Sequence, residues 1–254
     1  LGFGEYGFPE SHAASFALLV YVSAWLKHHE PAAFFAALIN SQPMGFYAPA
    51  QLVREARRQG VEVRAVDVRH SHWDCTLEAC TPSVGRSSGG QPALRLGLRL
   101  VKGLSQQGAE RLVATRADPG WQTLDELRAL ARLDKRDLKV LAGADALAGL
   151  AGNRHQAGWR VVRQDVAAGT PRRACGAQAS LPLPLPPEPA LPLLPKPTEG
   201  RDIVADYASL GLSPRRHPLA LLRQRLTDLG LGSAQDVEAA DPGQQVRTDR
   251  KSVV

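Results

Sequence analysis

A dense run of prolines most constrains how this chain can fold. Eight prolines fall between residues 179 and 197, at positions 182, 184, 186, 187, 189, 192, 195 and 197. Proline has no backbone N–H and fixes φ, so the run excludes helix and favours an extended, polyproline-type spacer. A ligand for an SH3-type domain is the alternative. We therefore expect folded regions before and after this run, joined by a spacer.

The composition is that of a globular chain with a basic balance of charge. With 254 residues, of which 44% are hydrophobic, the chain is long enough for one large core or two modest ones. The 31 Lys and Arg residues outnumber the 25 Asp and Glu residues, which gives a net charge of +6 and a pI near 9.5. This balance suits a polyanionic partner such as nucleic acid.

The cysteines and the apolar segments favour a reduced, cytosolic protein with no membrane partner. Cys75, Cys80 and Cys175 are too few and too unevenly spaced for a disulfide framework or a four-ligand zinc site. The most apolar stretch, residues 13–26, is shorter than the roughly 20 residues that cross a bilayer. No basic segment precedes it, as one would in a signal peptide. We expect this stretch to form a buried helix of a soluble protein.

The first 60 residues have the pattern of three helices. Ser11 is a plausible N-cap for the first helix, and Pro31 suits the first turn of the second. The third helix is predicted over Pro49–Gln59, because Gly60 stands where a C-terminal glycine belongs.

Two runs of alternating apolar residues predict short strands. The run from Val61 to Val68 alternates roughly, whereas Leu94–Leu100 alternates strictly, with Arg95 and Arg99 on the opposite face. A loop rich in Gly and Ser, residues 83–90, would join the two strands.

Helical periodicity returns after residue 105 and continues to about residue 162. Three helices are predicted, one around Leu112 and Val113, one over Leu124–Leu133 and one over Leu138–Leu147. Beyond the proline run, Pro218–Leu229 predicts a short amphipathic helix and residues 241–246 a turn. The expected fold class is therefore mainly α with short β segments.

The sharpest local signal is an apolar–Gly–apolar turn at Val101–Leu104, directly before a predicted helix. Glycine permits a tight turn, and the free N–H groups of the next helix can bind a phosphate. Nearby basic side chains would add charge without reading bases, so binding would be independent of sequence and sensitive to salt. An ordinary turn that caps an ordinary helix is the alternative. The candidate DNA-binding residues are Lys102, Gly103, Leu104, Ser105, Arg111 and Arg116.

A second candidate lies at the start of the first helix, where Ser11 and His12 follow a Gly-Phe-Pro-Glu sequence. A helix N-terminus with these side chains can meet a phosphate or an incoming nucleotide. The pattern alone favours a helix cap and a satisfied polar side chain.

The remaining polar residues form no recognisable catalytic or metal site. The histidines at positions 28, 29, 70 and 72 lack zinc-ligand spacing with the nearby cysteines. Asp67 and Asp74 are not paired as two-metal carboxylates. Neither a Walker loop nor a Ser/His/Asp arrangement can be recognised in the sequence. Catalysis is therefore not visible in this chain.

Several longer motifs follow one another along the sequence. They lie at Gly7–Ala17, Tyr21–Lys27, Pro31–Phe34, Leu38–Tyr47, Val61–Arg64, Trp73–Cys75, Leu94–Leu98, Val101–Leu104, Asp206–Ser209 and His217–Leu219. Taken in order, they closely resemble the bacterial C-family DNA polymerases, the relatives of the replicative polymerase III alpha subunit. Phe-Pro-Glu-Ser-His at 8–12 and Asn-Ser-Gln-Pro-Met-Gly-Phe-Tyr at 40–47 look like the error-prone branch. The resemblance covers nearly the whole chain.

The resemblance implies a division of the chain into parts of such a polymerase. These would be the distal fingers domain (1–78), a loop (79–92), a tandem helix-hairpin-helix region that grips duplex DNA (93–165), the proline-rich linker (166–200), and a lead-in with a helix before an absent OB-fold (201–247). The last residues, 248–254, are expected to be an artefactual tail, because Asp249–Val254 can be encoded by a sequencing adapter.

The resemblance also implies the activity of the parent protein. That protein would be an error-prone, DNA-directed DNA polymerase that adds dNTPs to a primer during damage-tolerant repair synthesis. The family's three palm aspartates, which hold Mg²⁺ for nucleotidyl transfer, would lie upstream of Leu1. This chain alone would then bind no cofactor and be inactive.

Further expectations concern partners and location. The partners would be primer–template duplex DNA and dNTPs, with a sliding clamp and damage-response polymerase accessory proteins as further partners of the parent, in the bacterial cytoplasm. The alternative is a stand-alone, non-catalytic helix-hairpin-helix DNA-binding module.

Overall fold

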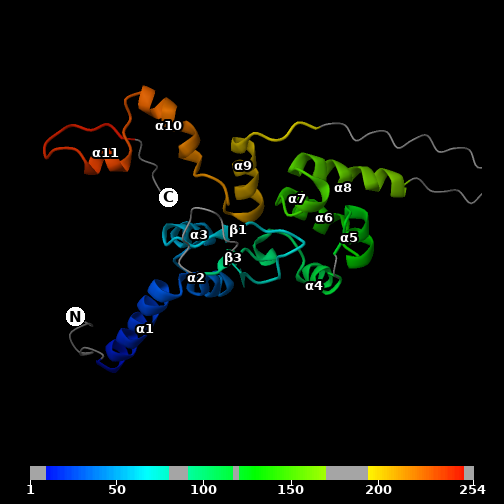
Figure 1. Ribbon diagram of the computed structural model, residues 1–254, viewed down its shortest axis with the longest axis horizontal. Coiled ribbons are helices and arrows are strands. Elements are labelled where there is room, and N and C mark those ends of the chain that lie inside the picture. Colours follow the sequence, from blue (N-terminus) through cyan, green and yellow to red (C-terminus); the bar gives the residue numbers. More distant parts are fainter. Residues whose placement is uncertain (1–9, 80–90, 117–119, 170–193, 249–254) are drawn as a thin grey trace, which may run out of the picture.

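The computed structural model describes residues 10–79, 91–116, 120–169 and 194–248. Helices dominate this part of the chain, and one small sheet lies among them, as expected for a mainly α fold with short β segments (Figure 1).

The first helices begin and end close to where the sequence predicts. They are α1 (Glu10–His29), α2 (Pro31–Asn40) and α3 (Pro49–Arg58). Prolines begin α2 and α3, and Gly60 follows α3 with φ of +85°. The predicted first-turn proline and the predicted C-terminal glycine are therefore confirmed. The N-cap prediction at Ser11 was wrong, because α1 already includes Glu10 and so takes Ser11 into its first turn.

A three-stranded sheet contains β1 (Val63–Arg64), β2 (Thr76–Glu78) and β3 (Ala93–Arg95) in the order β1-β3-β2. The central strand β3 pairs parallel with β1 and antiparallel with β2. The sequence did not predict β2.

The strict alternation of Leu94–Leu100 predicted one strand, but only the first part of this run is a strand. The strand stops at Arg95, and Leu98–Leu100 forms a 3₁₀ helix, η1, closed by the N–H of Val101 on the carbonyl of Leu98 at 2.9 Å. Leu94 and Leu98 are nevertheless fully buried. A tight turn can bury the same residues as a strand, so the alternation alone could not distinguish them.

The next helices are α4 (Gln106–Ala114), α5 (Leu124–Ala131), α6 (Lys135–Gly143), α7 (Ala148–Ala151) and α8 (Arg154–Gly169). Leu133 and Leu147, predicted inside helices, lie in the turns after α5 and before α7, and both are buried. Helix α8 extends beyond residue 162, into the range assigned to the linker.

After the proline run the chain forms α9 (Glu199–Leu210), α10 (Pro218–Asp228) and α11 (Ala234–Glu238). Residues 170–193, which include six of the eight prolines of the run, lie outside the described residues, as does most of the proposed artefactual tail. Helix α9 buries Ile203 and Leu210, whereas no residue of α10 or α11 is buried.

One hydrophobic core runs from α2 through the sheet and α4–α8 to Leu212. Helix α1 is not part of it. Leu19 and Val20 of α1 are 59% and 65% exposed, and the helix projects away from the rest of the molecule (Figure 1). The prediction of a buried helix was therefore wrong for this chain. Among the described residues no helix is long and apolar enough to cross a membrane.

Candidate nucleic-acid interface

The predicted turn around Gly103 is one of two hairpins with the same local structure. Gly103 has φ of +82°, and Ser105, two residues later, is the N-cap of α4. Arg132 has φ of +46°, and Asp134, two residues later, is the N-cap of α6. A left-handed residue therefore precedes each helix at the same distance, and the second hairpin is a structural repeat of the first.

The two hairpins are joined by Asp137, which is 2% exposed. Its carboxylate accepts hydrogen bonds from the Ser105 backbone N–H at 3.0 Å and from the Ser105 hydroxyl at 2.7 Å. Ser105 Oγ in turn accepts from the N–H of Gly108 at 3.0 Å. A side chain at Gly108 would collide with the Asp137 carboxylate. The N-terminus of α4 is thus held against the first turn of α6.

At the start of both α4 and α6, some backbone N–H groups have no acceptor within the helix. The first turn of a helix provides no intrahelical acceptors for its N–H groups. At α4 the amides of Gln106 and Gln107 are in this position, and at α6 that of Arg136. Together with the positive end of the helix dipole, such amides favour a phosphate.

The three predicted basic residues all bind backbone carbonyls of neighbouring segments. Lys102 Nζ donates to Tyr207 O at 3.1 Å, and Arg111 Nε donates to Ala131 O at 3.2 Å. The Arg116 guanidinium donates to the carbonyls of the 68–71 loop, twice at 2.7 Å, and its burial lowers the pKa of this group. These contacts fix the hairpins to α9, to α5 and to the loop. The role of the three residues in DNA binding stays a prediction.

Sequence reasoning missed the basic residues of the second hairpin. Arg132, Arg136 and Lys139 are exposed there, and Arg136 reaches toward Gly103 of the first hairpin. The signal was a Gly-Leu-Ser at 103–105 repeated as Arg-Leu-Asp at 132–134. An arginine in the place of the glycine concealed it, because non-glycine residues seldom adopt positive φ.

Ser11 and His12 do not lie near the hairpins. They occupy the first turn of α1, the end that points away from the other helices (Figure 1). The His12 ring is exposed and lies 4.3 Å from the ring of Phe16. The side chain of Ser11 lies outside the described part of the structure. Their proximity to nucleotide or template stays a prediction.

Three carboxylates, those of Asp145, Asp202 and Asp206, gather where α9 meets α6 and α8. Two arginines neutralise them: Arg154 contacts Asp202 and Asp206, and Arg215 contacts all three, at 3.0–3.3 Å. Burial raises the pKa of Asp145. Because guanidinium groups occupy the carboxylates, the cluster does not fit a magnesium ion.

Other candidate metal and nucleophilic side chains are also engaged. Asp67 binds Arg69 at 3.0 Å and Asp74 binds Arg99 at 2.8 Å. Burial raises the pKa of the Cys75 thiol to about 11, so that it is not a thiolate at neutral pH. Across the ranges that the structure describes, no cluster of three or more His, Cys, Asp or Glu side chains could hold a metal ion.

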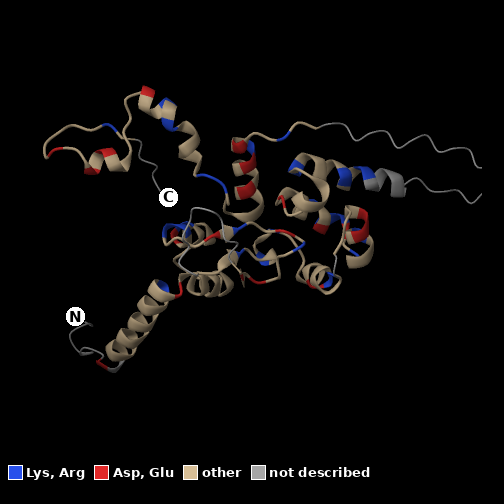
Figure 2. Cartoon of the chain, in the orientation of Figure 1, with Lys and Arg blue, Asp and Glu red and all other residues tan. Residues whose placement is uncertain are grey.

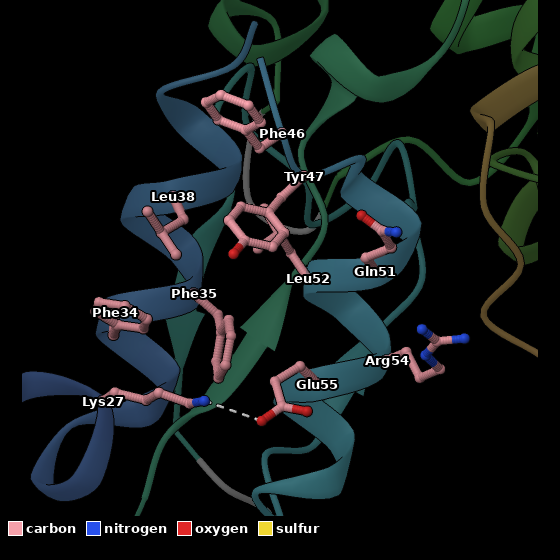
Figure 3. A pocket seen from close by; sticks show the side chains of 10 residues that line it. All are labelled: Lys27, Phe34, Phe35, Leu38, Phe46, Tyr47, Gln51, Leu52, Arg54 and Glu55. Carbon is pink, nitrogen blue, oxygen red and sulfur yellow. Dashed lines mark ion pairs between the residues drawn. The ribbon is translucent and has the colours of Figure 1, made fainter. Parts of the chain in front are cut away.

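An aromatic pocket of about 470 Å³ lies between α2 and α3. Phe34, Phe35 and Leu38 of α2 form one wall and Leu52 of α3 another, with the Lys27–Glu55 ion pair at one end (Figure 3). Phe46 lies at the opposite end, and the Tyr47 ring lies between the two walls. The pocket contains no arrangement of groups that indicates a reaction.

Comparisons with known proteins identify the region that contains the hairpins. The model of a family described as "Helix-hairpin-helix motif" matches residues 60–157. This range includes both hairpins and the sheet.

Curated relatives match almost the whole chain. Proteins named "Error-prone DNA polymerase" are 55% identical over 97% of the chain in Alkalilimnicola ehrlichii, 53% over 92% in Methylococcus capsulatus and 49% over 96% in Pseudomonas fluorescens. The chain spans only 22–23% of the length of these relatives. The resemblance stated from the motifs is thereby confirmed.

Proposed function

Because the chain belongs to the error-prone DNA polymerase family over nearly all of its own length, we propose that it functions as one part of such an enzyme. The parent would extend a primer on a DNA template with dNTPs during repair or damage-tolerant synthesis. This chain would hold the duplex and supply part of the fingers, while residues outside it perform nucleotidyl transfer.

The observation that carries this proposal is the pair of hairpins. Each provides a left-handed turn and a capped helix start with N–H groups for a phosphate, and Asp137 holds the two in one unit. Phosphate contacts of this kind position a protein on DNA without reading its sequence. A polymerase that moves along its template needs that property.

The predicted site residues have two proposed roles. The turn formed by Gly103, Leu104 and Ser105 would bring the free amides of Gln106 and Gln107 to the phosphate, since the N–H groups of Leu104 and Ser105 already donate to Val101 O and to the Asp137 carboxylate. Lys102, Arg111 and Arg116 would add positive charge while they anchor the hairpins through the carbonyl contacts described above. The exposed Arg132, Arg136 and Lys139 would supply the charge at the second hairpin.

The parent's other requirements would be met outside the described residues. Its Mg²⁺ would be held by carboxylates elsewhere, since the acidic cluster found here is neutralised by arginines. Contacts to a sliding clamp and accessory proteins, and a cytoplasmic location, belong to this proposal as properties of the whole polymerase. A stand-alone DNA-binding module is not favoured, because the matching relatives are named as polymerases.

The duplex-binding role can be tested with matched charge reversals. One variant carries Arg132→Glu and Arg136→Glu in the second hairpin, and the control carries Arg201→Glu and Arg225→Glu on the exposed faces of α9 and α10. Both change the net charge equally. Affinity for a duplex of arbitrary sequence is measured by fluorescence anisotropy at several salt concentrations.

We expect the hairpin variant to bind about tenfold or more weakly at low salt. The slope of its affinity against salt concentration, both on logarithmic scales, should become shallower by about one for each phosphate that it no longer neutralises. The control should retain most of the affinity. Equal reductions in both variants would mean that net charge and not the hairpins determines binding. Primer extension by this chain alone should be absent, and activity would refute the placement of catalysis outside it.

A further inference from the structure

Helix α1 exposes an apolar surface that the rest of the chain does not cover. Its 20 residues carry charge only at the two ends, at Glu10 and Lys27, so that the helix is uncharged over most of its length in Figure 2. The large apolar side chains of α1 that are more than one third exposed, here called the α1 surface, are Phe16, Leu18, Leu19, Val20, Tyr21, Val22, Trp25 and Leu26.

The α1 surface surrounds the helix. Leu18 to Val22 are consecutive and all exposed, so they point in every direction from the helix axis. A surface helix normally has one polar face, whereas a helix that is apolar all round belongs in the interior of a larger protein. Isolated apolar residues on a surface need no explanation, but eight on one helix do.

The last turn of α1 is held firmly by the folded part of the chain. Lys27 Nζ forms a 3.0 Å ion pair with Glu55 of α3. Gln91 Nε2 donates to His29 O at 2.7 Å. The helix is therefore directed outward from a fixed base.

The aromatic pocket continues the α1 surface at this base. Lys27 of α1 and Phe34 of α2 both line the pocket, and Phe46 at its edge is 92% exposed (Figure 3). The loop that presents Phe46 is tied down by Arg99, which donates to Gln42 O at 3.0 Å. An apolar side chain on a protein surface can enter such a preformed pocket.

The relatives are long enough to supply what covers this surface. More than three quarters of each relative lies outside the segment that matches this chain, since the chain spans 22–23% of them. We propose that the α1 surface and the adjoining pocket dock against another part of the same polymerase polypeptide. This inference rests on the proposed function, because it requires the chain to be one part of that enzyme.

Thiol labelling tests the proposal. Leu19→Cys lies on the α1 surface, and Val204→Cys on α9 is the matched control, because Leu19 and Val204 are 59% and 71% exposed. Each is made in this chain alone and in the full-length Alkalilimnicola ehrlichii polymerase, with this chain replacing the homologous segment. Maleimide labelling rates are read peptide by peptide by mass spectrometry.

We expect both cysteines to react readily in the chain alone. In the full-length protein, labelling of Leu19→Cys should slow by about tenfold or more, as for a site that reacts only after local opening, while Val204→Cys should keep its rate. Unchanged labelling of Leu19→Cys in the full-length protein would overturn the proposal. Val20→Cys, at a position 65% exposed, replaces Leu19→Cys if that variant fails to fold by circular dichroism.

Two other outcomes would also overturn the proposal that the α1 surface docks against the same polypeptide. Protection of Leu19→Cys in the isolated chain, together with a dimer in light scattering, would identify a second copy as the occupant. Protection of the isolated chain only in the presence of phosphatidylglycerol vesicles would identify a lipid surface. Duplex binding by the Leu19→Cys chain reports on the hairpins separately, so a failure of docking is distinguishable from a failure of the proposed DNA grip.

Discussion

The buried ion cluster predicts a large loss of stability when Arg154 is replaced by methionine. Arg154 is 9% exposed; it donates to Asp202 O at 3.0 Å and contacts the carboxylates of Asp202 and Asp206. Methionine preserves much of the aliphatic volume but removes the charge. Three carboxylates, those of Asp145, Asp202 and Asp206, would then share only Arg215.

The magnitude follows from burial. Asp202 and Asp206 are 4% and 1% exposed, so water cannot replace the missing guanidinium. Removing one partner of a buried ion pair costs about 3–5 kcal/mol, which is a large part of the roughly 5–15 kcal/mol that stabilises a typical domain. The matched control is Arg216→Met, because Arg216 forms an ion pair with Glu199 in which its own side chain is 63% exposed. Exposed pairs of this kind contribute little.

The assay is urea denaturation followed by tryptophan fluorescence, combined with hydrogen exchange. We expect Arg154→Met to lower the unfolding midpoint strongly and Arg216→Met to leave it nearly unchanged. Faster exchange in α9 alone would show that α9 detaches before the rest unfolds. Equal midpoints for the two variants would refute the reasoning that burial determines the contribution of these arginines.

Two further predictions concern packing and pH. A Cβ on Gly97 would lie 2.5 Å from Trp73 O and from the backbone carbon of Asp74, so Gly97→Ala should destabilise the chain by about 1–3 kcal/mol. At Gly158 in α8 nothing lies within 4 Å of an added Cβ, so Gly158→Ala should stabilise the chain by about 0.5–1 kcal/mol. Thermal unfolding of both variants measures the difference. Hydrogen bonds from Arg95 and Arg64 lower the pKa of Glu78 from 4.5 to about 2. A lowered carboxyl pKa contributes stability above the unfolded value that is lost as pH falls through the folded value. The wild-type midpoint in urea should therefore fall between about pH 5 and pH 2, and Glu78→Gln should lack that part of the fall. Identical pH profiles for the two proteins would contradict the assignment.

Helix starts, helix ends and turns that depend on local backbone chemistry were predicted correctly. Pro31, Pro49 and Gly60 act through their own φ angle or missing N–H. The two prolines lie in the first turns of α2 and α3 and Gly60 follows the end of α3, as predicted. The turn at Gly103 is of the same kind, with positive φ and the capped helix immediately after it. Such features need no knowledge of distant residues.

Features that depend on long-range contacts were not predictable in the same way. The partners of Arg154 lie 48 and 52 residues away, beyond the proline run, and nothing in the sequence pairs them. Lys102 and Arg116 were expected to face DNA because they are basic, yet their nearest acceptors are carbonyls from segments 105 and 45–48 residues away. The prediction that α1 is buried was wrong for a related reason. An apolar sequence shows that a helix favours burial, but it does not show whether the same chain contains the residues that pack against it.

The contacts that α9 makes with residues 102–154 do not depend on an unbroken chain through the proline-rich segment. Helix α9 is held to α8 by Arg154, to the turn after α6 by the Arg215–Asp145 ion pair, and to the first hairpin by Lys102. None of these contacts involves residues 170–193. A protease that cuts after Arg172 or Arg173 would therefore produce two polypeptides that remain associated, and the nicked protein would migrate as two bands under denaturing conditions but elute as one species from a sizing column.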